Sequence, residues 1–154
     1  MKKKTKISEK QPKQGKKMVE KAGRAMKEGF YLEAAWILSA IFENKIRNLF
    51  WKLENQKPGA GLSLEQCIKR LKYMHVTGKY PLLTTHISIR LVDEIRNWKN
   101  QRNTIMKDML HVHVSMVRVE KLSLEGIELL KKWNLAGKKI KDELKKSNLP
   151  PPLL

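Results

Sequence analysis

The sequence predicts an all-α fold: an antiparallel, up-and-down bundle of four to five helices in one domain. Apolar residues recur at three- and four-residue intervals along most of the chain, which is typical of helices with one buried face. Glycine and proline cluster at a few points between these stretches. A length of 154 residues suits one buried core better than two. We therefore expect the bundle over residues 18–147, with a basic arm, residues 1–17, before it and a Pro-rich tail, residues 148–154, after it.

The arm carries much of the chain's positive charge. Residues 1–17 contain eight lysines and one acidic residue, Glu9, while Pro12 and Gly15 interrupt any apolar pattern, so we expect a solvated, mostly disordered segment. The whole chain has a net charge of +18, which attracts polyanions and favours nucleic acid as a partner. An ordinary solubility or genome-composition effect explains the lysine content equally well at this stage.

The first apolar stretch predicts a helix from about Met18 or Phe30 to about Asn55, with Gly29 as a candidate break. A turn cluster follows at residues 58–61. Ser63 and Gln66 then have the spacing of a capping box, in which each side chain satisfies a free backbone N–H group of the other residue. This box predicts the start of a second helix that runs to about residue 75.

Residues 77–81 are expected to form a loop, because Gly78 and Pro81 both disfavour continuation of a helix. A third helix should begin near Thr84 or Thr85. Its apolar stripe consists of Ile87, Leu91, Ile95, Trp98, Ile105 and Met109. Alternating β-branched residues over 111–119 favour an extended connection, and a last helix is expected from about Ser123 to about Lys146.

The third predicted helix contains the pattern Trp98-x-x-x-Arg102-Asn103, followed by Lys107. This pattern resembles the Arg-Asn-x-x-x-His signature of the higher-eukaryote and prokaryote nucleotide-binding (HEPN) helical domains, with a lysine at the histidine position. The likeness extends over roughly residues 18–146, because residues 33–53 look like the first long helix of the family and residues 124–130 like its closing helix. It implies a HEPN-like bundle that binds RNA, uses no cofactor and faces a second copy across a homodimer.

Many members of this family are metal-independent ribonucleases. Such cleavage needs a group that takes the 2′-hydroxyl proton and a cation that stabilises the phosphate. Arginine supplies the cation and asparagine can orient the substrate. Lysine has an ordinary pKa near about 10.4, so Lys107 is almost wholly protonated at neutral pH and a poor base. The candidate catalytic residues are Arg102, Asn103, Lys107 and His111, and the candidate nucleic-acid-binding residues are Arg96, Lys99, Arg102 and Lys107.

Three functions fit these residues. The first is a HEPN-like RNA-binding protein with a degenerate or silenced ribonuclease centre, of toxin–antitoxin or phage-defence type, with an antitoxin protein as a further partner. The second is an active ribonuclease that uses Lys107 or His111, since His111 would share a stripe with Asn103 and Lys107 if the helix continued that far. The third is a non-catalytic dimerisation module whose charge is incidental.

Other classes of site find little support. Cys67 is the only cysteine, so no internal disulfide forms, and His111-x-His113 without further ligands is a poor zinc site, so no metal is expected. No apolar run is long enough for a membrane span, which favours a cytoplasmic protein without a membrane partner. The four tryptophans, Trp36, Trp51, Trp98 and Trp133, are interpreted as core or dimer packing rather than platforms for base stacking.

Overall fold

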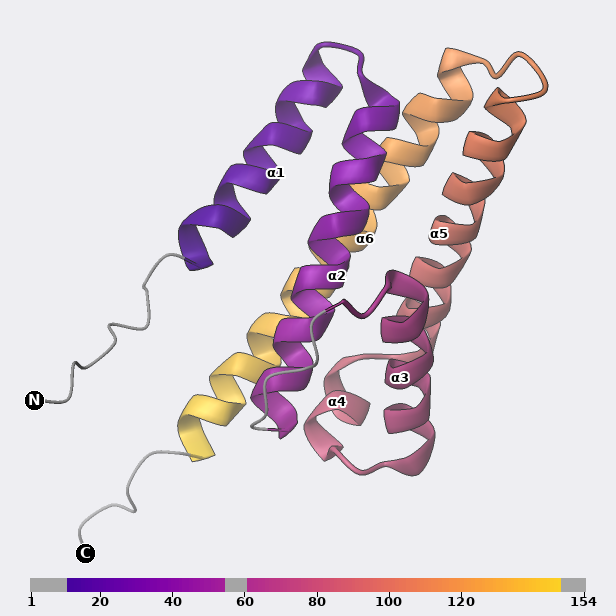
Figure 1. Cartoon of the computed structure of the whole chain (residues 1–154). Coiled ribbons are helices and arrows are strands. Elements are labelled where there is room, and N and C mark those ends of the chain that lie inside the picture. Colours follow the sequence, from indigo (N-terminus) through magenta and orange to yellow (C-terminus); the bar gives the residue numbers. More distant parts are fainter. Residues whose placement is uncertain (1–10, 55–60, 148–154) are drawn as a thin grey trace, which may run out of the picture.

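The computed structural model describes residues 11–54 and 61–147, which form six helices and no strand (Figure 1). The all-α prediction is confirmed for these residues, although the helices outnumber the four to five expected. The predicted tail, residues 148–154, lies outside the described residues. The helices are α1 (Gln11–Lys27), α2 (Tyr31–Glu54), α3 (Leu64–Thr77), α4 (Pro81–His86), α5 (Ile89–Met109) and α6 (Met116–Ser147).

The first predicted helix is divided at Gly29. This residue has a φ of 79°, in the left-handed region that glycine adopts without steric cost, and its N–H donates to the carbonyl oxygen of Met26 at 3.1 Å. Helix α1 begins at Gln11, inside the expected arm, so the helical part of the chain starts earlier than residue 18. Pro12 does not prevent this start, because proline is tolerated in the first turn of a helix, where its missing N–H has no partner to lose. Residues 1–10 lie outside the described part.

The capping box that begins α3 is confirmed. The Ser63 hydroxyl oxygen accepts a hydrogen bond from the Gln66 backbone N–H at 3.3 Å, and the Gln66 side-chain oxygen accepts one from the Ser63 N–H at 2.9 Å. A carboxylate oxygen of Glu43 in α2 accepts from the Leu64 N–H at 3.1 Å. Side chains from two helices therefore satisfy free donors at this helix start, which also fixes α3 against α2.

The boundaries around the third predicted helix differ from the prediction. Pro81 begins the short helix α4 instead of ending a loop, since its fixed φ suits the first helical position. Helix α5 starts at Ile89, where the Ser88 hydroxyl accepts from the Leu91 N–H at 3.1 Å. Helix α6 starts at Met116, so the extended segment expected over 111–119 is shorter than predicted. The hydroxyl of Ser115 accepts from the Arg118 N–H at 3.3 Å and caps α6 despite the β-branched residues that follow.

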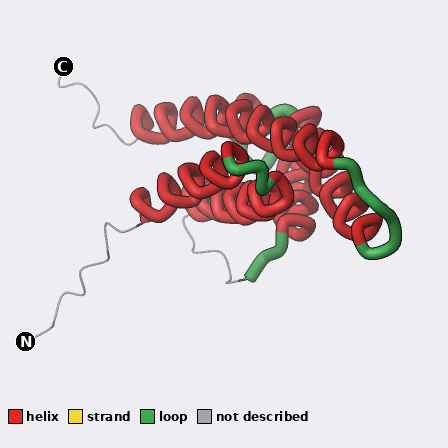
Figure 2. The backbone as a smooth tube through the Cα atoms, turned by 90° about the horizontal axis from the view of Figure 1, so that it is seen from above, coloured by secondary structure: helices red, strands yellow, loops and turns green. Residues whose placement is uncertain are grey.

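The long helices pack as two hairpins. Helices α1 and α2 run in opposite directions, as do α5 and α6, while α3 and α4 lie at the lower end of the molecule (Figure 1). Seen from above, α6 and α1 lie on different sides of the bundle (Figure 2). Helix α2 packs against both α1 and α6. Because α2 and α6 run in the same direction, the bundle is not antiparallel at every contact.

Trp98 of α5 lies at the centre of the core. It is 2% exposed, its indole N–H donates to the Leu122 carbonyl of α6 at 2.8 Å, and its ring lies 5.6 Å from that of Phe42 in α2. Trp98 therefore contacts both α2 and α6 and fixes the position of α5 along the axis of the bundle. Trp133 is also buried, as expected for a core residue, whereas Trp36 and Trp51 are 57% and 40% exposed. No helix of the described residues combines the length and the apolar character needed to cross a lipid bilayer.

Candidate nucleic-acid interface

The middle of α5 carries positive charge and amide groups without acidic side chains. Residues 95–107 contain four basic residues, four Asn or Gln residues and no Asp or Glu. The carboxylates of α5 lie nearer its ends, where Asp93, Glu94 and Asp108 each form an ion pair with a basic side chain. Buried Ile95, Trp98 and Ile105 anchor this stretch in the core. The basic and amide side chains lie on the other faces of this stretch of α5.

Arg102 turns from α5 towards α2. One nitrogen of its guanidinium, Nη1, donates to the hydroxyl of Ser39, which is buried in α2. The Nε and Nη2 groups both donate to the side-chain oxygen of Asn103, at 3.3 and 2.9 Å. These contacts hold the two residues of the Arg-Asn motif together. They use three of the five N–H donors of an arginine, so one N–H on Nη1 and one on Nη2 have no protein acceptor among the described residues.

The charge of Arg102 has no carboxylate partner within ion-pair distance in the described part of the chain. Burial lowers the pKa of Arg102, and the nearby carboxylate of Glu43 raises it in part. Arginine nevertheless stays charged at any physiological pH. A partly buried cation with two open donors and no contacting carboxylate is a favourable position for an anion such as a phosphate.

Trp36 of α2 completes the surroundings of Arg102. The guanidinium carbon lies 5.5 Å from the centre of the Trp36 ring, within the range of a cation–π interaction. More than half of the Trp36 side chain remains exposed. An exposed aromatic ring beside an arginine is an arrangement on which a nucleic-acid base can stack. Sequence reasoning interpreted Trp36 as packing and missed Ser39 altogether, because their proximity to Arg102 depends on how α2 packs.

Lys99, predicted to contact nucleic acid, is buried against α3 instead of lying on the exposed face of α5. Its ammonium group forms an ion pair with Glu65 of α3, and the residue is only 7% exposed. Burial lowers the pKa of Lys99, and the charge of Arg102 lowers it further. The pair joins α5 to α3 beneath the exposed polar surface.

A polar stripe follows the exposed face of α5. Arg96, Asn100, Asn103 and Lys107 are all exposed, and at about 100° per residue they lie within about 60° of one another around the helix. Asn103 connects this stripe to Arg102 through its side-chain oxygen. Arg102 and Lys107 are five residues apart, which separates their side chains by about 140°. Lys107 therefore lies one turn from Asn103, on the same face as Arg96 but about 16 Å from it along the helix axis, and on a different side of α5 from Arg102.

His111 lies outside the helix. Helix α5 ends at Met109, and His111 is an exposed residue in the turn that leads to α6. The stripe of Asn103, Lys107 and His111 depended on a longer helix and does not form. His113 is exposed in the same connection, and the described residues contain no group of three or more His, Cys, Asp or Glu side chains able to hold a metal ion. Burial raises the pKa of Cys67 to about 11, so this thiol is a poor nucleophile at neutral pH.

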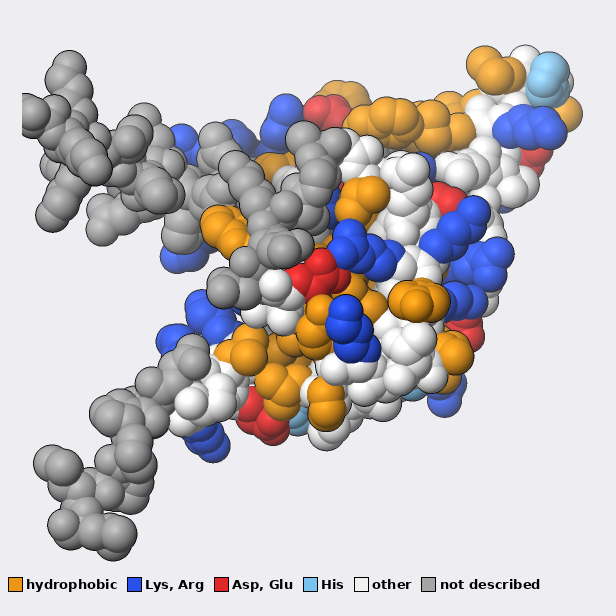
Figure 3. All heavy atoms as spheres, turned by 60° about the horizontal axis from the view of Figure 1, so that its bottom comes forward, with side chains coloured by type: hydrophobic (Ala, Val, Ile, Leu, Met, Phe, Trp, Pro, Cys, Tyr) orange, Lys and Arg blue, Asp and Glu red, His pale blue; other side chains and the backbone are white. Residues whose placement is uncertain are grey.

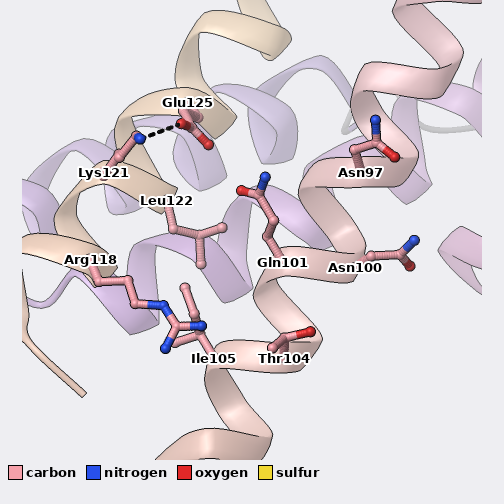
Figure 4. Close-up of a pocket in the computed structure, with 9 residues that line it drawn as sticks. All are labelled: Asn97, Asn100, Gln101, Thr104, Ile105, Arg118, Lys121, Leu122 and Glu125. Carbon is pink, nitrogen blue, oxygen red and sulfur yellow. Dashed lines mark ion pairs between the residues drawn. The ribbon is translucent and has the colours of Figure 1, made fainter.

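The stripe continues into a polar pocket of about 570 Å³ between α5 and α6. Asn97, Asn100, Gln101 and Thr104 of α5 line one wall, and Figure 4 shows the side chain of Gln101 directed towards α6. The basic residues on the α6 wall are neutralised: Lys121 pairs with Glu125 at 3.9 Å, and Arg118 with Asp108 at 2.9 Å. This pocket offers amide and hydroxyl groups for hydrogen bonding, while Arg96, Arg102 and Lys107, which form no ion pair with a described residue, lie outside its lining.

Comparison of the chain with protein-family models, with curated proteins and with solved structures found no match. The geometry alone therefore defines the candidate site. We call it the α5 interface, and it consists of Trp36, Arg96, Asn100, Arg102, Asn103 and Lys107.

Proposed function

We propose that this protein binds single-stranded RNA through the α5 interface, as a HEPN-like protein with a degenerate or silenced ribonuclease centre. The observation that carries the proposal is the partly buried guanidinium of Arg102 beside the exposed ring of Trp36. No carboxylate of the described residues lies within ion-pair distance of it, and two of its N–H donors have no acceptor among those residues. A phosphate accepts from the guanidinium while a neighbouring base stacks on the ring.

Unpaired bases fit this surface better than a duplex does. Recognition of single strands combines cations that follow the backbone with aromatic rings and hydrogen bonds to base edges. The stripe supplies the cations Arg96 and Lys107, and neither forms an ion pair with a described residue. Asn100 and the amides of the adjoining pocket supply both donors and acceptors.

Binding is favoured over catalysis because the interface lacks a proton acceptor suited to neutral pH. Lys107 is an exposed lysine on a different side of α5 from Arg102, and His111 lies beyond the end of the helix. A dimerisation module that binds no ligand would not explain why Arg102 lies beside the exposed ring of Trp36 without a carboxylate partner among the described residues. The homodimer, the antitoxin partner and the role in a toxin–antitoxin or phage-defence system stay predictions from the resemblance.

The sharpest test keeps the charge of the protein unchanged. Trp36→Ala is expected to weaken binding of a fluorescein-labelled oligouridine about tenfold in a fluorescence anisotropy titration, because stacking on an aromatic side chain contributes about 1–3 kcal/mol per base. Trp51→Ala is the matched control, since Trp51 is a half-exposed tryptophan on the same helix away from Arg102. We expect this control to change the affinity less than about twofold.

Equal affinities of the two variants would contradict the stacking role of Trp36. Arg102→Lys adds a second measurement at constant charge, because lysine lacks the planar fork that reaches Ser39, Asn103 and a phosphate together. The same samples are then incubated with RNA and analysed on a gel. Cleavage by the natural chain that disappears in Arg102→Lys would replace the binding proposal by the ribonuclease alternative.

A further inference from the structure

A second basic surface lies on another part of the molecule. A groove of about 550 Å³ lies between the C-terminal halves of α2 and α6. These halves lie side by side at the lower end of the view in Figure 1. Five lysines line the groove, and Asp142 is the only acidic residue among the lining residues. We call it the lysine groove, and its basic residues are Lys45 and Lys52 of α2 with Lys138, Lys141 and Lys145 of α6.

Within residues 11–54 and 61–147, no carboxylate lies within ion-pair distance of the groove lysines. Asp142 lines the groove but forms no ion pair with these lysines, while Glu54 binds Arg70 at 2.5 Å and Glu143 binds His86 at 2.7 Å. The contrast with the pocket between α5 and α6, where the basic side chains are paired, makes the groove the more attractive surface for an anion.

The lysines of the groove also act on one another. Burial lowers the pKa of Lys45 and of Lys52. The charges of Lys141, Lys45 and Lys145 lower the pKa of Lys52 further, which places all four ammonium groups within one shared field. Like charges held together without counter-charges destabilise the chain on which they lie. An anion that enters the groove relieves this repulsion and gains several attractive contacts at once.

The arrangement of the lysines matches a linear polyanion. Lys45 and Lys52 are seven residues apart on α2, and Lys138 and Lys145 are seven apart on α6, which corresponds to about 10 Å along each helix axis. The two helices run side by side in the same direction, so their lysines form two rows that flank the groove. A strand with stacked bases has one phosphate per about 3.4 Å, as in one strand of a duplex, so this length accommodates about three consecutive phosphates of a stacked strand and fewer of an extended one.

We propose that the lysine groove binds the phosphate backbone of about three consecutive nucleotides of the RNA strand that the α5 interface contacts. This inference rests on the proposed function, since it takes RNA as the ligand of the chain. The exposed amides of Asn48 and Asn134, which also line the groove, are placed to donate to phosphate or sugar oxygens. The groove gives affinity without sequence preference, and the α5 interface supplies the contacts to bases.

An anionic membrane surface fits the groove less well. Binding at a membrane surface combines basic residues with exposed apolar side chains that enter the lipid. The apolar residues of the groove, Leu49, Trp133 and Ile140, are buried beneath the lysines. Figure 3 views the molecule from this end and shows basic side chains on several parts of the face, with hydrophobic side chains between some of them. A concave, lysine-lined groove is better suited to a flexible phosphate chain.

The test compares two triple variants of the full chain that remove the same charge. The first is Lys45→Gln, Lys52→Gln and Lys141→Gln in the groove. The second is Lys21→Gln, Lys27→Gln and Lys69→Gln, three exposed lysines outside it. Oligouridine affinity is measured by fluorescence anisotropy at several salt concentrations. We expect the groove variant to bind at least tenfold more weakly and to reduce the slope of log K against log salt by about 2, which is the loss of three phosphate contacts on a single strand.

Each outcome has a distinct meaning. The control variant should lose no more than about twofold, and an equal loss in both triple variants would overturn the groove in favour of a general effect of net charge. If Trp36→Ala weakens RNA binding but the groove variant does not, the lysine groove does not bind RNA and the α5 interface does. Sensitivity to the groove variant alone supports the groove and contradicts the α5 interface. If the groove lysines support sedimentation with phosphatidylserine vesicles but not RNA binding, the ligand is a membrane and the inference is wrong.

Discussion

Gly126→Val is expected to lower the free energy of unfolding by about 3 kcal/mol, because no side chain fits at this position of α6. A Cβ atom added at Gly126 would lie 2.8 and 2.9 Å from two ring carbons of Trp98 and 3.0 Å from a methyl carbon of Leu38. Carbon atoms in contact normally lie about 3.5–4.0 Å apart. The indole would have to move by more than half an ångström, and the two further methyl groups of valine increase the overlap.

Trp98 cannot move without cost. Its indole N–H donates to the Leu122 carbonyl at 2.8 Å, and its ring packs against Phe42. A displaced ring loses a hydrogen bond in a buried setting, which costs about 1–3 kcal/mol if the donor finds no other acceptor. Arg102 follows Trp98 by about one helical turn, so a shift of α5 also disturbs the contacts of Arg102 with Ser39 and Trp36. We therefore expect weaker RNA binding together with lower stability.

Two alanine variants of α6 test whether the effect depends on the contact with Trp98: Gly137→Ala is the control, and Gly126→Ala places the same substitution against Trp98. Gly137→Ala should stabilise the protein by up to about 1 kcal/mol, because alanine favours a helix over glycine and an added Cβ at Gly137 meets no atom within 4 Å. Gly126→Ala should destabilise it by about 1–2 kcal/mol, since the overlap with Trp98 outweighs the same gain in helix propensity. Urea unfolding followed by circular dichroism measures both changes. Equal shifts of the two alanine variants would show that the contact between Gly126 and Trp98 is not tight.

Local signals in the sequence predicted those parts of the fold that depend on a few neighbouring residues. The capping box of Ser63 and Gln66, the break at Gly29 and the burial of Trp98 are of this kind. Ser88 and Ser115 are also helix caps, and their hydroxyl groups could have located the starts of α5 and α6. Pro81 was misinterpreted because proline both ends and begins helices, and the short α4 lacks a periodic pattern that would decide between the two.

The candidate site was predictable only where its residues are adjacent in sequence. Arg102 and Asn103 were identified from the motif, and their side chains do contact one another. Ser39 and Trp36 come from a helix more than sixty residues earlier, and no local pattern shows that they meet Arg102. Lys99 looks like its neighbouring surface residues in the sequence, and only the packing of α3 against α5 reveals that Glu65 covers it. The lysine groove likewise joins two helices that are distant in sequence.

Glu65→Gln is expected to lower the free energy of unfolding by about 3 kcal/mol at pH 7, because it leaves the ammonium group of Lys99 buried without a counter-charge. Removing one partner of a buried ion pair typically costs about 3–5 kcal/mol. The lower end of this range applies here, since the side chain of Lys99 is 9% exposed but that of Glu65 is 34% exposed, so water screens part of the attraction. The positive charge of Arg102, which already lowers the pKa of Lys99, adds repulsion to the unpaired ammonium group.

The pH dependence identifies Lys99 as the cause of this loss. A lysine whose pKa is lower in the folded state binds fewer protons folded than unfolded, so the free energy of unfolding rises with pH through the lowered pKa towards the ordinary value near about 10.4. The deficit of Glu65→Gln relative to the natural chain should therefore shrink between pH 7 and pH 10. Lys99→Met in the same variant should restore most of the stability at pH 7, because it removes the buried charge and keeps an unbranched side chain of similar length.

Glu128→Gln is the control, since it breaks the ion pair of Glu128 with Lys131, in which both side chains are about two-thirds exposed. This loss should stay below about 0.5 kcal/mol. Urea unfolding at pH 7 and pH 10 gives all the required free energies. If Glu65→Gln matches Glu128→Gln at pH 7, then Lys99 reaches water on its own and becomes available to RNA as the sequence first suggested. A large deficit that Lys99→Met relieves instead shows that Lys99 is part of the buried scaffold that positions Arg102 in the α5 interface.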